Sequence, residues 1–286
     1  ALMNNIIPQD SQGTPLPAAV FSGDFNAGKS LLINALLHQN SLFISREESM
    51  TPPVLVAKSD GGDVIYGARP RGEREAVALS REQFLSSRKV GGVPCESDAL
   101  CVLAPEMPFR HFVLVDTPGA SSQENRPAIP AAAPALDNAL FVLVTTLEYW
   151  PARHTMSLIR EYQMRFPGRF IVVANMADHI NTNEIRRVRD KGRQRMERNG
   201  IAPAPPFFTL SARLELARRT GDDEYRRRIK ADVRELCDAG FDAFRVALYE
   251  FEAKVASRAV DYDLETLLNS PLAEAVIMNQ KGQKIC

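Results

Sequence analysis

Eight residues near the N-terminus have the types and spacing needed to bind phosphate. The segment Gly23-Asp-Phe-Asn-Ala-Gly28-Lys29-Ser30 places two glycines around a short turn and ends in a lysine and a serine. Glycines let the backbone curl so that successive N–H groups point at phosphate oxygens, and a helix N-terminus adds partial positive charge. An apolar run on each side predicts the strand–loop–helix unit that this motif requires. We therefore expect Lys29 to reach the β- and γ-phosphates of a nucleotide and Ser30 to ligate Mg²⁺.

A second motif, Phe112-Val-Leu-Val-Asp116-Thr-Pro-Gly119, follows another apolar strand. The strand would deliver Asp116 to the sheet edge beside the phosphate loop, where its carboxylate can hold a water on Mg²⁺. The N–H of Gly119 would then face the γ-phosphate. Asp-Thr-Pro-Gly is also good turn chemistry, but its position downstream of a phosphate loop favours the functional interpretation.

Two further motifs could read a base. In Phe170-Ile-Val-Val-Ala-Asn175-Met176-Ala-Asp178, the Asp178 carboxylate can accept hydrogen bonds from both N1–H and N2–H₂ of guanine, which adenine cannot offer. Asn175 is expected to hold the phosphate loop and approach N7. Met176 stands where such motifs usually carry a lysine, so an apolar contact with the base is kept without the ammonium. In the last motif, Ser211-Ala212, the Ala212 N–H is expected to meet guanine O6.

The elements that position these motifs alternate between short β-rich runs and longer amphipathic stretches. Strands are predicted at 18–22, 54–58, 63–66, 99–103, 112–116, 139–145, 169–174 and 207–210. Helices are predicted at 29–38, 81–87, 152–165, 183–199, 224–237 and 241–259. Strands that are apolar on both faces, with helices between them, indicate a mostly parallel sheet covered on both sides, an α/β sandwich. After residue 211 the pattern is helical only, and residues from about 240 are expected to leave the α/β domain.

Composition limits the class of protein. The chain of 286 residues is 45% hydrophobic, which excludes a disordered or collagen-like chain. Its 35 Lys and Arg balance 35 Asp and Glu, so no overall field should draw it to nucleic acid or anionic membrane. The four cysteines form no C-x-x-C pair and the histidines are scattered, which favours reduced thiols in a cytoplasmic protein without zinc. We expect no signal peptide and no membrane helix.

These four motifs, in this order, resemble the GTPase superfamily of P-loop proteins, and most closely its dynamin-like branch, including the bacterial members. Residues 23–37, Gly-Asp-Phe-Asn-Ala-Gly-Lys-Ser-Leu-Leu-Ile-Asn-Ala-Leu-Leu, look like the bacterial dynamin pattern G-E-F-x-A-G-K-S-x-x-x-N-A-L. A long segment then separates this loop from Asp-Thr-Pro-Gly, and residues 240–245 resemble the start of the helix that closes such domains. The resemblance covers about residues 15–257 and implies a P-loop NTPase sandwich.

The resemblance implies a set of site residues. Thr51, in the loop after the first helix, would ligate Mg²⁺ and position the attacking water through its backbone. Lys29, Thr51 and Gly119 would act in catalysis, and Ser30, Thr51 and Asp116 would hold Mg²⁺. The nucleotide, GTP or GDP, would contact Gly23, Asp24, Phe25, Asn26, Ala27, Gly28, Lys29, Ser30, Leu31, Asp116, Asn175, Asp178, Ser211 and Ala212.

Three functions stay open on the sequence alone. The first is a Mg²⁺-dependent GTPase whose turnover is slow until a second copy closes the site, because Phe25 has no side-chain group that could orient water. The second is a nucleotide-binding assembly or scaffold protein with negligible hydrolysis, and the third a P-loop ATPase. The basic stretch 186–198 has no interleaved aromatic residues, so we expect a solvated helix face and no direct nucleic-acid binding.

The resemblance also implies a domain organisation. Residues 1–15 would be an N-terminal segment, 16–239 the GTPase domain, and 240–286 C-terminal helices that begin a truncated helical stalk. A nucleotide-dependent homodimer through the GTPase domain is expected. Contacts with a membrane or another partner would lie outside this chain, which would leave the full protein cytoplasmic or peripheral to a membrane.

Overall fold

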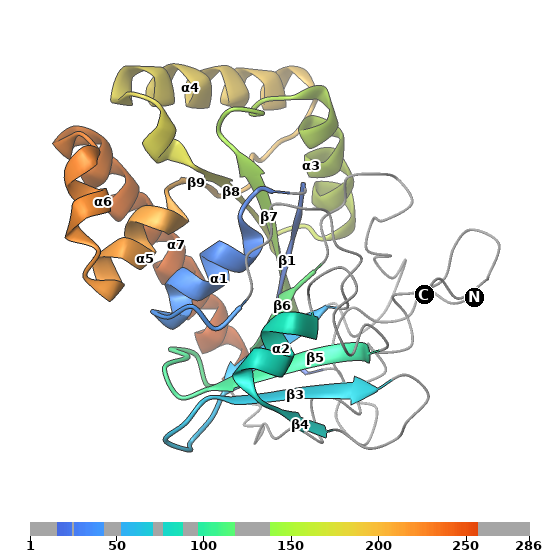
Figure 1. Cartoon of the computed structure of the whole chain (residues 1–286). Coiled ribbons are helices and arrows are strands. Elements are labelled where there is room, and N and C mark those ends of the chain that lie inside the picture. The colour runs from blue at the N-terminus through green and yellow to red at the C-terminus, as the bar shows by residue number, and fades with distance from the viewer. Residues whose placement is uncertain are drawn as a thin grey trace.

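One twisted sheet carries the candidate motifs (Figure 1). The structure, a computed structural model, describes residues 16–24, 26–42, 53–70, 77–87, 97–117 and 138–256. Within those ranges nine strands form a single sheet in the order β4-β3-β5-β2-β6-β1-β7-β8-β9. They are β1 (Ala18–Gly23), β2 (Val54–Lys58), β3 (Ile65–Pro70), β4 (Val77–Leu79), β5 (Ser97–Ala104), β6 (Val113–Asp116), β7 (Ala139–Thr146), β8 (Phe170–Asn175) and β9 (Phe207–Thr209).

The half of the sheet that carries the motifs is parallel. Strands β6, β1, β7, β8 and β9 all run in one direction, whereas β2 pairs with β6 in antiparallel fashion and β3 pairs with both β4 and β5 in antiparallel fashion. In the registers, Phe21 of β1 lies opposite Asp116 of β6, and Thr146 of β7 lies opposite Asn175 of β8. The carboxyl ends of these strands therefore meet at one edge, where α/β sheets bind their ligands.

Helices cover both faces of the sheet, as the sequence predicted. They are α1 (Lys29–Leu37), α2 (Arg81–Ser87), α3 (Arg153–Arg165), α4 (Thr182–Arg198), α5 (Ala212–Thr220), α6 (Asp223–Arg228) and α7 (Ala231–Val255). All six residues of β1 are buried, and the first four alternate between two apolar clusters. Ala18 and Val20 share a cluster with residues of α3 and α4, whereas Ala19 and Phe21 share one with residues of α1 and α7. The fold is therefore the α/β P-loop NTPase sandwich.

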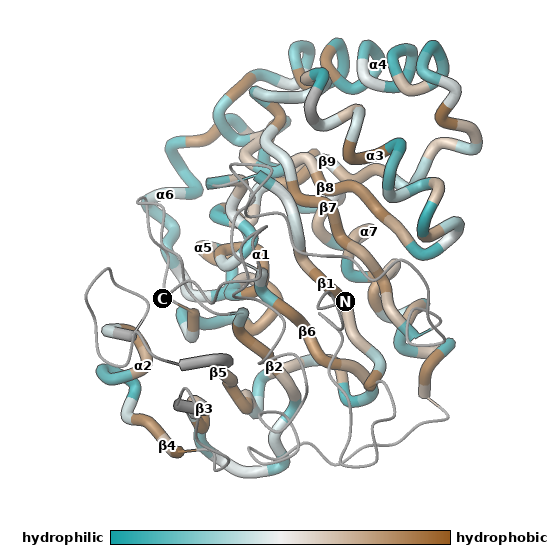
Figure 2. The backbone as a smooth tube through the Cα atoms, turned by 90° about the vertical axis from the view of Figure 1, so that its right-hand side faces the viewer, coloured by the Kyte–Doolittle hydropathy of each residue, from teal (hydrophilic) through white to brown (hydrophobic). Residues whose placement is uncertain are grey.

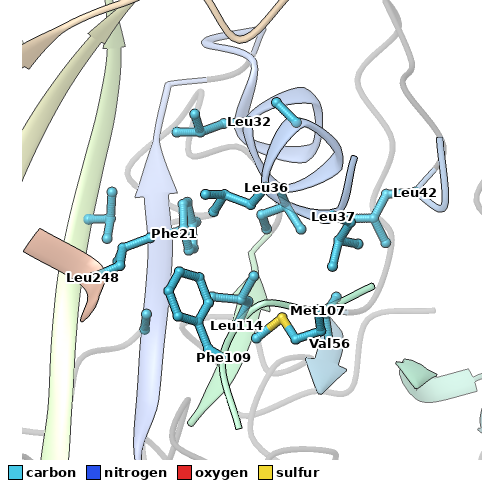
Figure 3. Packing of buried hydrophobic residues seen from close by; sticks show 14 of the residues in the cluster. Phe21, Leu32, Leu36, Leu37, Leu42, Val56, Met107, Phe109, Leu114 and Leu248 are labelled. Atoms are coloured by element: carbon cyan, nitrogen blue, oxygen red, sulfur yellow. The ribbon is translucent and has the colours of Figure 1, made fainter. Parts of the chain in front are cut away.

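Hydropathy follows these layers. Figure 2 shows β1, β6 and β7 mostly brown along their length, and α4 with teal turns between brown ones. Only four residues of α4 are buried, among them Ile185 and Met196, so the helix packs along a single stripe. Figure 3 shows the opposite layer, in which Leu36 of α1 and Leu248 of α7 approach Phe21 of β1. Burying each such side chain stabilises the fold by about 1.5–3 kcal/mol, and this holds α1 against the strand that precedes it.

The last helix remains part of the α/β body beyond residue 240. The boundary expected between residues 239 and 240 falls inside α7, which runs unbroken from Ala231 to Val255. Its residues Phe241, Phe244 and Leu248 are fully buried in the same cluster as β1. A Cβ at Gly240 would lie 1.9 Å from the carbonyl oxygen of Thr209, so the helix crosses the end of β9 at a distance that only glycine permits.

The structure divides the C-terminal helices differently from the prediction. The helix expected at 224–237 is broken, because α6 ends at Arg228 and α7 begins at Ala231. The break lets Arg226 donate to both carboxylate oxygens of Asp238 at 3.2 and 2.8 Å. The sequence did not predict helix α5 or the short, largely exposed strand β4. The helix expected at 241–259 is the second half of α7, as far as the described residues extend.

Candidate functional site

The loop between β1 and α1 has a backbone that only glycine can adopt at two points. Gly23 has φ +137°, and a Cβ there would lie 1.9 Å from the carbonyl oxygen of Val144 on β7. Gly28 has φ +84°, and its Cβ would lie 2.4 Å from Asn175 Nδ2. Both positions are strained or blocked for any other residue. The loop is thus curled against the ends of β7 and β8; Phe25 lies outside the described residues.

Lys29 turns back over this loop. Its Nζ donates to the carbonyl oxygens of Gly23 at 3.1 Å and Asp24 at 2.8 Å, and the residue is buried. Gly28 is the N-cap residue of helix α1, so no side chain caps the helix, and its first turn contains no acidic residue. The positive end of the helix dipole and the lysine ammonium therefore act at the same place, and together they favour an anion.

Ser30 and Asp116 meet at the carboxyl edge of β1 and β6. The Ser30 hydroxyl donates to Asp116 Oδ2 at 2.6 Å, and Asp116 is fully buried. Next to it, the Thr117 hydroxyl donates to the carbonyl oxygen of Phe21 at 2.7 Å and fixes the end of β6 against β1. A hydroxyl and a carboxylate are the oxygen donors that Mg²⁺ prefers, so these two residues fit that ion. Thr51 and Gly119 lie outside the described residues.

Asn175 connects three of the four motifs. Its Nδ2 donates to the carbonyl oxygen of Ala27 in the phosphate loop at 3.0 Å, and its Oδ1 accepts from the N–H of Ala212 at 2.9 Å. The side chain is buried, so both bonds are made away from water. Asn175 thus links the phosphate loop to the start of α5. The Ala212 N–H, expected to face guanine O6, is bonded to Asn175 in this structure.

Met176 lies beside the phosphate loop. It adopts the left-handed conformation, with φ 62°, immediately after β8. A Cβ placed on Gly28 would be 3.7 Å from Met176 Cε, so the thioether end reaches the loop through an apolar contact. No ammonium is present at this position, and Met176 can offer a base only van der Waals contact.

Asp178 is covered by a residue that the sequence motifs did not point to. The Tyr225 hydroxyl of α6 donates to Asp178 Oδ2 at 2.5 Å, and the Asp178 side chain is only 2% exposed. His179 Nε2 lies 4.0 Å from the same oxygen. The Arg213 guanidinium lies over the Tyr225 ring, 4.0 Å from its centroid. Burial and the neighbouring Asp178 carboxylate raise the pKa of the Tyr225 phenol, which therefore keeps its proton at neutral pH.

The described residues offer neither a clustered metal site nor a membrane-spanning helix. No group of three or more His, Cys, Asp and Glu side chains gathers there as a metal cluster would require. In the same part of the chain, no helix combines the length and apolar character needed to cross a membrane.

Comparison with known proteins supports the fold. No protein-family model matches the chain, and no curated protein matches it in sequence. Among solved structures, it is similar to two chains of an oligomerised bacterial dynamin pair described as a mechanism for long-range sensing and tethering of membranes. Identities are 13% and 12% with TM-scores of 0.54 and 0.51, and each match covers 84% of this chain and 41% of the other.

A looser likeness is to Aquifex aeolicus Era bound to GDP and AlF4⁻, with a TM-score of 0.35 and 14% identity over 74% of this chain and 56% of that one. The chain spans about two fifths of the bacterial dynamin chains that it matches. Over most of its own length, the chain therefore shares its fold, the α/β P-loop sandwich, with part of those two chains.

Proposed function

We propose that this chain binds guanine nucleotide and hydrolyses GTP to GDP and phosphate. The observation that carries the proposal is the Asn175 side chain, which bonds both to Ala27 in the phosphate loop and to Ala212 in the last motif. One buried amide thereby joins the loop suited to phosphates with the loops suited to a base. This arrangement supports a single nucleotide held at both ends.

Each residue has a distinct role in this proposal. Lys29 supplies positive charge to the β- and γ-phosphates, and Asp178 accepts from the donors of guanine. Ser30 and Asp116 hold Mg²⁺, which when bound neutralises charge on the phosphate oxygens. Thr51 and Gly119 would position the attacking water and contact the γ-phosphate. The protein contributes positioning and electrostatics, because phosphoryl transfer requires little covalent chemistry from it.

Self-association completes the proposal. Phe25 stands in the phosphate loop without a side-chain group that could orient water. A second copy facing the nucleotide edge could exclude water and close the site, so that nucleotide state and self-assembly would be coupled. The bacterial dynamin pair is described as oligomerised, which supports the self-association part of this proposal. Because the match covers only 41% of that protein, any membrane contact is proposed for regions outside this chain.

A scaffold protein that binds nucleotide with negligible hydrolysis is the second candidate. Phe25 and Met176 favour it, because both replace side chains that could act on water or on the base. Single-turnover hydrolysis of GTP by the purified chain, with excess protein and Mg²⁺, separates the two. Phosphate release that requires Lys29 supports the GTPase, whereas tight GTP binding without release supports the scaffold. Binding of GTP and ATP with equal affinity would contradict the guanine-specific GTPase, and hydrolysis of ATP would then favour a P-loop ATPase.

A further inference from the structure

The base-reading carboxylate already has a hydrogen-bond donor from within the chain. The Tyr225 hydroxyl donates to Asp178 Oδ2 at 2.5 Å, and 2% of the Asp178 side chain is exposed. A buried carboxylate must be paired, since an unpaired one costs several kcal/mol. Tyr225 supplies that pairing from α6, which lies 47 positions further along the chain.

The element that carries Tyr225 is short and lies on the surface. Helix α6 has six residues, none of them buried, and it follows Gly221, which has φ +75°. The Asp222 side chain caps it by accepting from the Tyr225 N–H at 3.1 Å. Arg226 attaches the helix to Asp238 of α7 and to the carbonyl oxygen of Leu214 at 3.1 Å. Tyr225 and Ile229, the residue that follows the helix, also pack against the edge of the apolar core. Helix α6 is therefore attached by a few polar bonds and a small apolar contact, and such a peripheral element can detach without opening the rest of the core.

We propose that Tyr225 competes with guanine for Asp178, so that α6 acts as a gate on the base site. This inference rests on the proposed function. Guanine N1–H and N2–H₂ can each replace the phenol as donors to the carboxylate, whereas adenine offers an acceptor at N1 and would leave the buried charge unpaired. A base is thus admitted only if it restores the hydrogen bond that its entry breaks.

The competition has a definite sign. In the Tyr225→Phe variant, Asp178 loses its donor while the ring and its packing under Arg213 remain. Guanine entry no longer breaks a bond to a charged group. We therefore expect GDP to bind about tenfold more tightly, equivalent to about 1.4 kcal/mol. If Tyr225 instead orients Asp178 for the base, its removal weakens GDP binding.

The test measures GDP affinity by calorimetry, together with thermal unfolding, for wild type, Tyr225→Phe and the matched control Tyr249→Phe. Tyr249 lies on α7, is 43% exposed, and packs against Phe109 away from the site. We expect tighter GDP binding only for Tyr225→Phe. We also expect its lower melting temperature without GDP to approach that of wild type at saturating GDP, because the nucleotide restores the lost bond. If Tyr225 had a purely structural role, Tyr225→Phe would melt below wild type by the same amount at every GDP concentration.

A second variant covers the case in which Tyr225→Phe folds poorly. Arg226→Ala removes the attachment of α6 to Asp238 and should also strengthen GDP binding. GDP binding by wild type, with equal or weaker binding by both variants, would overturn the inference and leave the proposed function standing. Failure of wild type to bind GDP would overturn the proposed function, and the inference with it.

Discussion

The Ser30 hydroxyl donates to Asp116 Oδ2 over 2.6 Å, although 86 positions separate the two residues. The contact exists because β1 and β6 are neighbouring parallel strands that both end at the carboxyl edge of the sheet. Ser30 is the second residue of α1, which follows the first of these strands after the phosphate loop, and Asp116 is the last residue of the second strand. The oxygen pair suited to Mg²⁺ is thus a product of strand order.

Ser30→Ala should weaken the Mg²⁺-dependent part of GDP binding by about tenfold, because one oxygen ligand and its bond to a charged partner are lost. GDP affinity measured with Mg²⁺ and with EDTA isolates that part. Ser157→Ala, in which an exposed hydroxyl bonded to the Arg153 carbonyl is removed, is the control. If Ser30→Ala lost as much GDP affinity in EDTA as in Mg²⁺, Ser30 would act on the nucleotide directly and not through the ion.

Lys29→Ala should weaken GTP binding about tenfold to a hundredfold, since charge-assisted bonds to phosphate are lost. Lys29 contributes little to the apolar core, so the melting temperature should change by only a few degrees. Binding of fluorescent mant-GTP and thermal unfolding are measured together, with the exposed Lys191→Ala on α4 as control. Unchanged affinity would exclude a phosphate-binding role for the loop.

Asp178→Asn should shift base preference from guanine toward xanthine. The carboxylate accepts from two donors of guanine, whereas an amide can also donate to the carbonyl oxygen at C2 of xanthine. Competition by GTP, XTP and ATP against a fluorescent nucleotide measures the shift in wild type and variant. Wild-type protein that prefers neither GTP nor ATP would contradict the base-reading roles of Asn175 and Asp178.

Asn175→Ala should lower the free energy of unfolding by about 2–4 kcal/mol, because the Ala27 carbonyl and the Ala212 N–H both lose a buried partner. Urea unfolding without nucleotide measures this loss. Asn199→Ala is the matched control, since its exposed amide makes one bond to the Arg195 carbonyl. The control should lose less than about 0.5 kcal/mol. Similar losses in both variants would mean that Asn175 does not join the loops in solution.

The chain should be monomeric with GDP and dimeric with GDP, aluminium fluoride and Mg²⁺. Sedimentation velocity in both states tests this, and specific activity should rise with protein concentration because dimerisation follows mass action. A monomeric transition-state complex with constant specific activity would place the closure of the site within one chain or in another protein.

Several features follow from local sequence and agree with the structure. The ranges expected for β2 and α2 match their observed bounds, and the apolar run of β1 is buried on both faces as a central parallel strand should be. Gly23 and Gly28 mark the curled loop, because a left-handed backbone is a property of single residues. The strand–loop–helix unit around Lys29 can therefore be predicted from its local sequence alone.

Other features depended on contacts between residues distant in sequence. Arg226 pairs with Asp238 across the break between α6 and α7, although helical periodicity favours a continuous helix. Gly240 lies in the middle of α7 only because Thr209 passes beside it. In the same way, Ala212 bonds to Asn175, and Tyr225 bonds to Asp178.

The sequence by itself determined the motifs, their order and the α/β alternation, since each is encoded by residue type and short-range periodicity. Only the tertiary structure decided which donor occupies each acceptor at the site. Tyr225 and Asp178 are 47 positions apart, and no local pattern couples them. Their bond arises because α5 packs against both α6 and α7, and α7 packs against the turn Ala177–His179 that carries Asp178. Side-chain partners of that kind are chosen by packing in three dimensions.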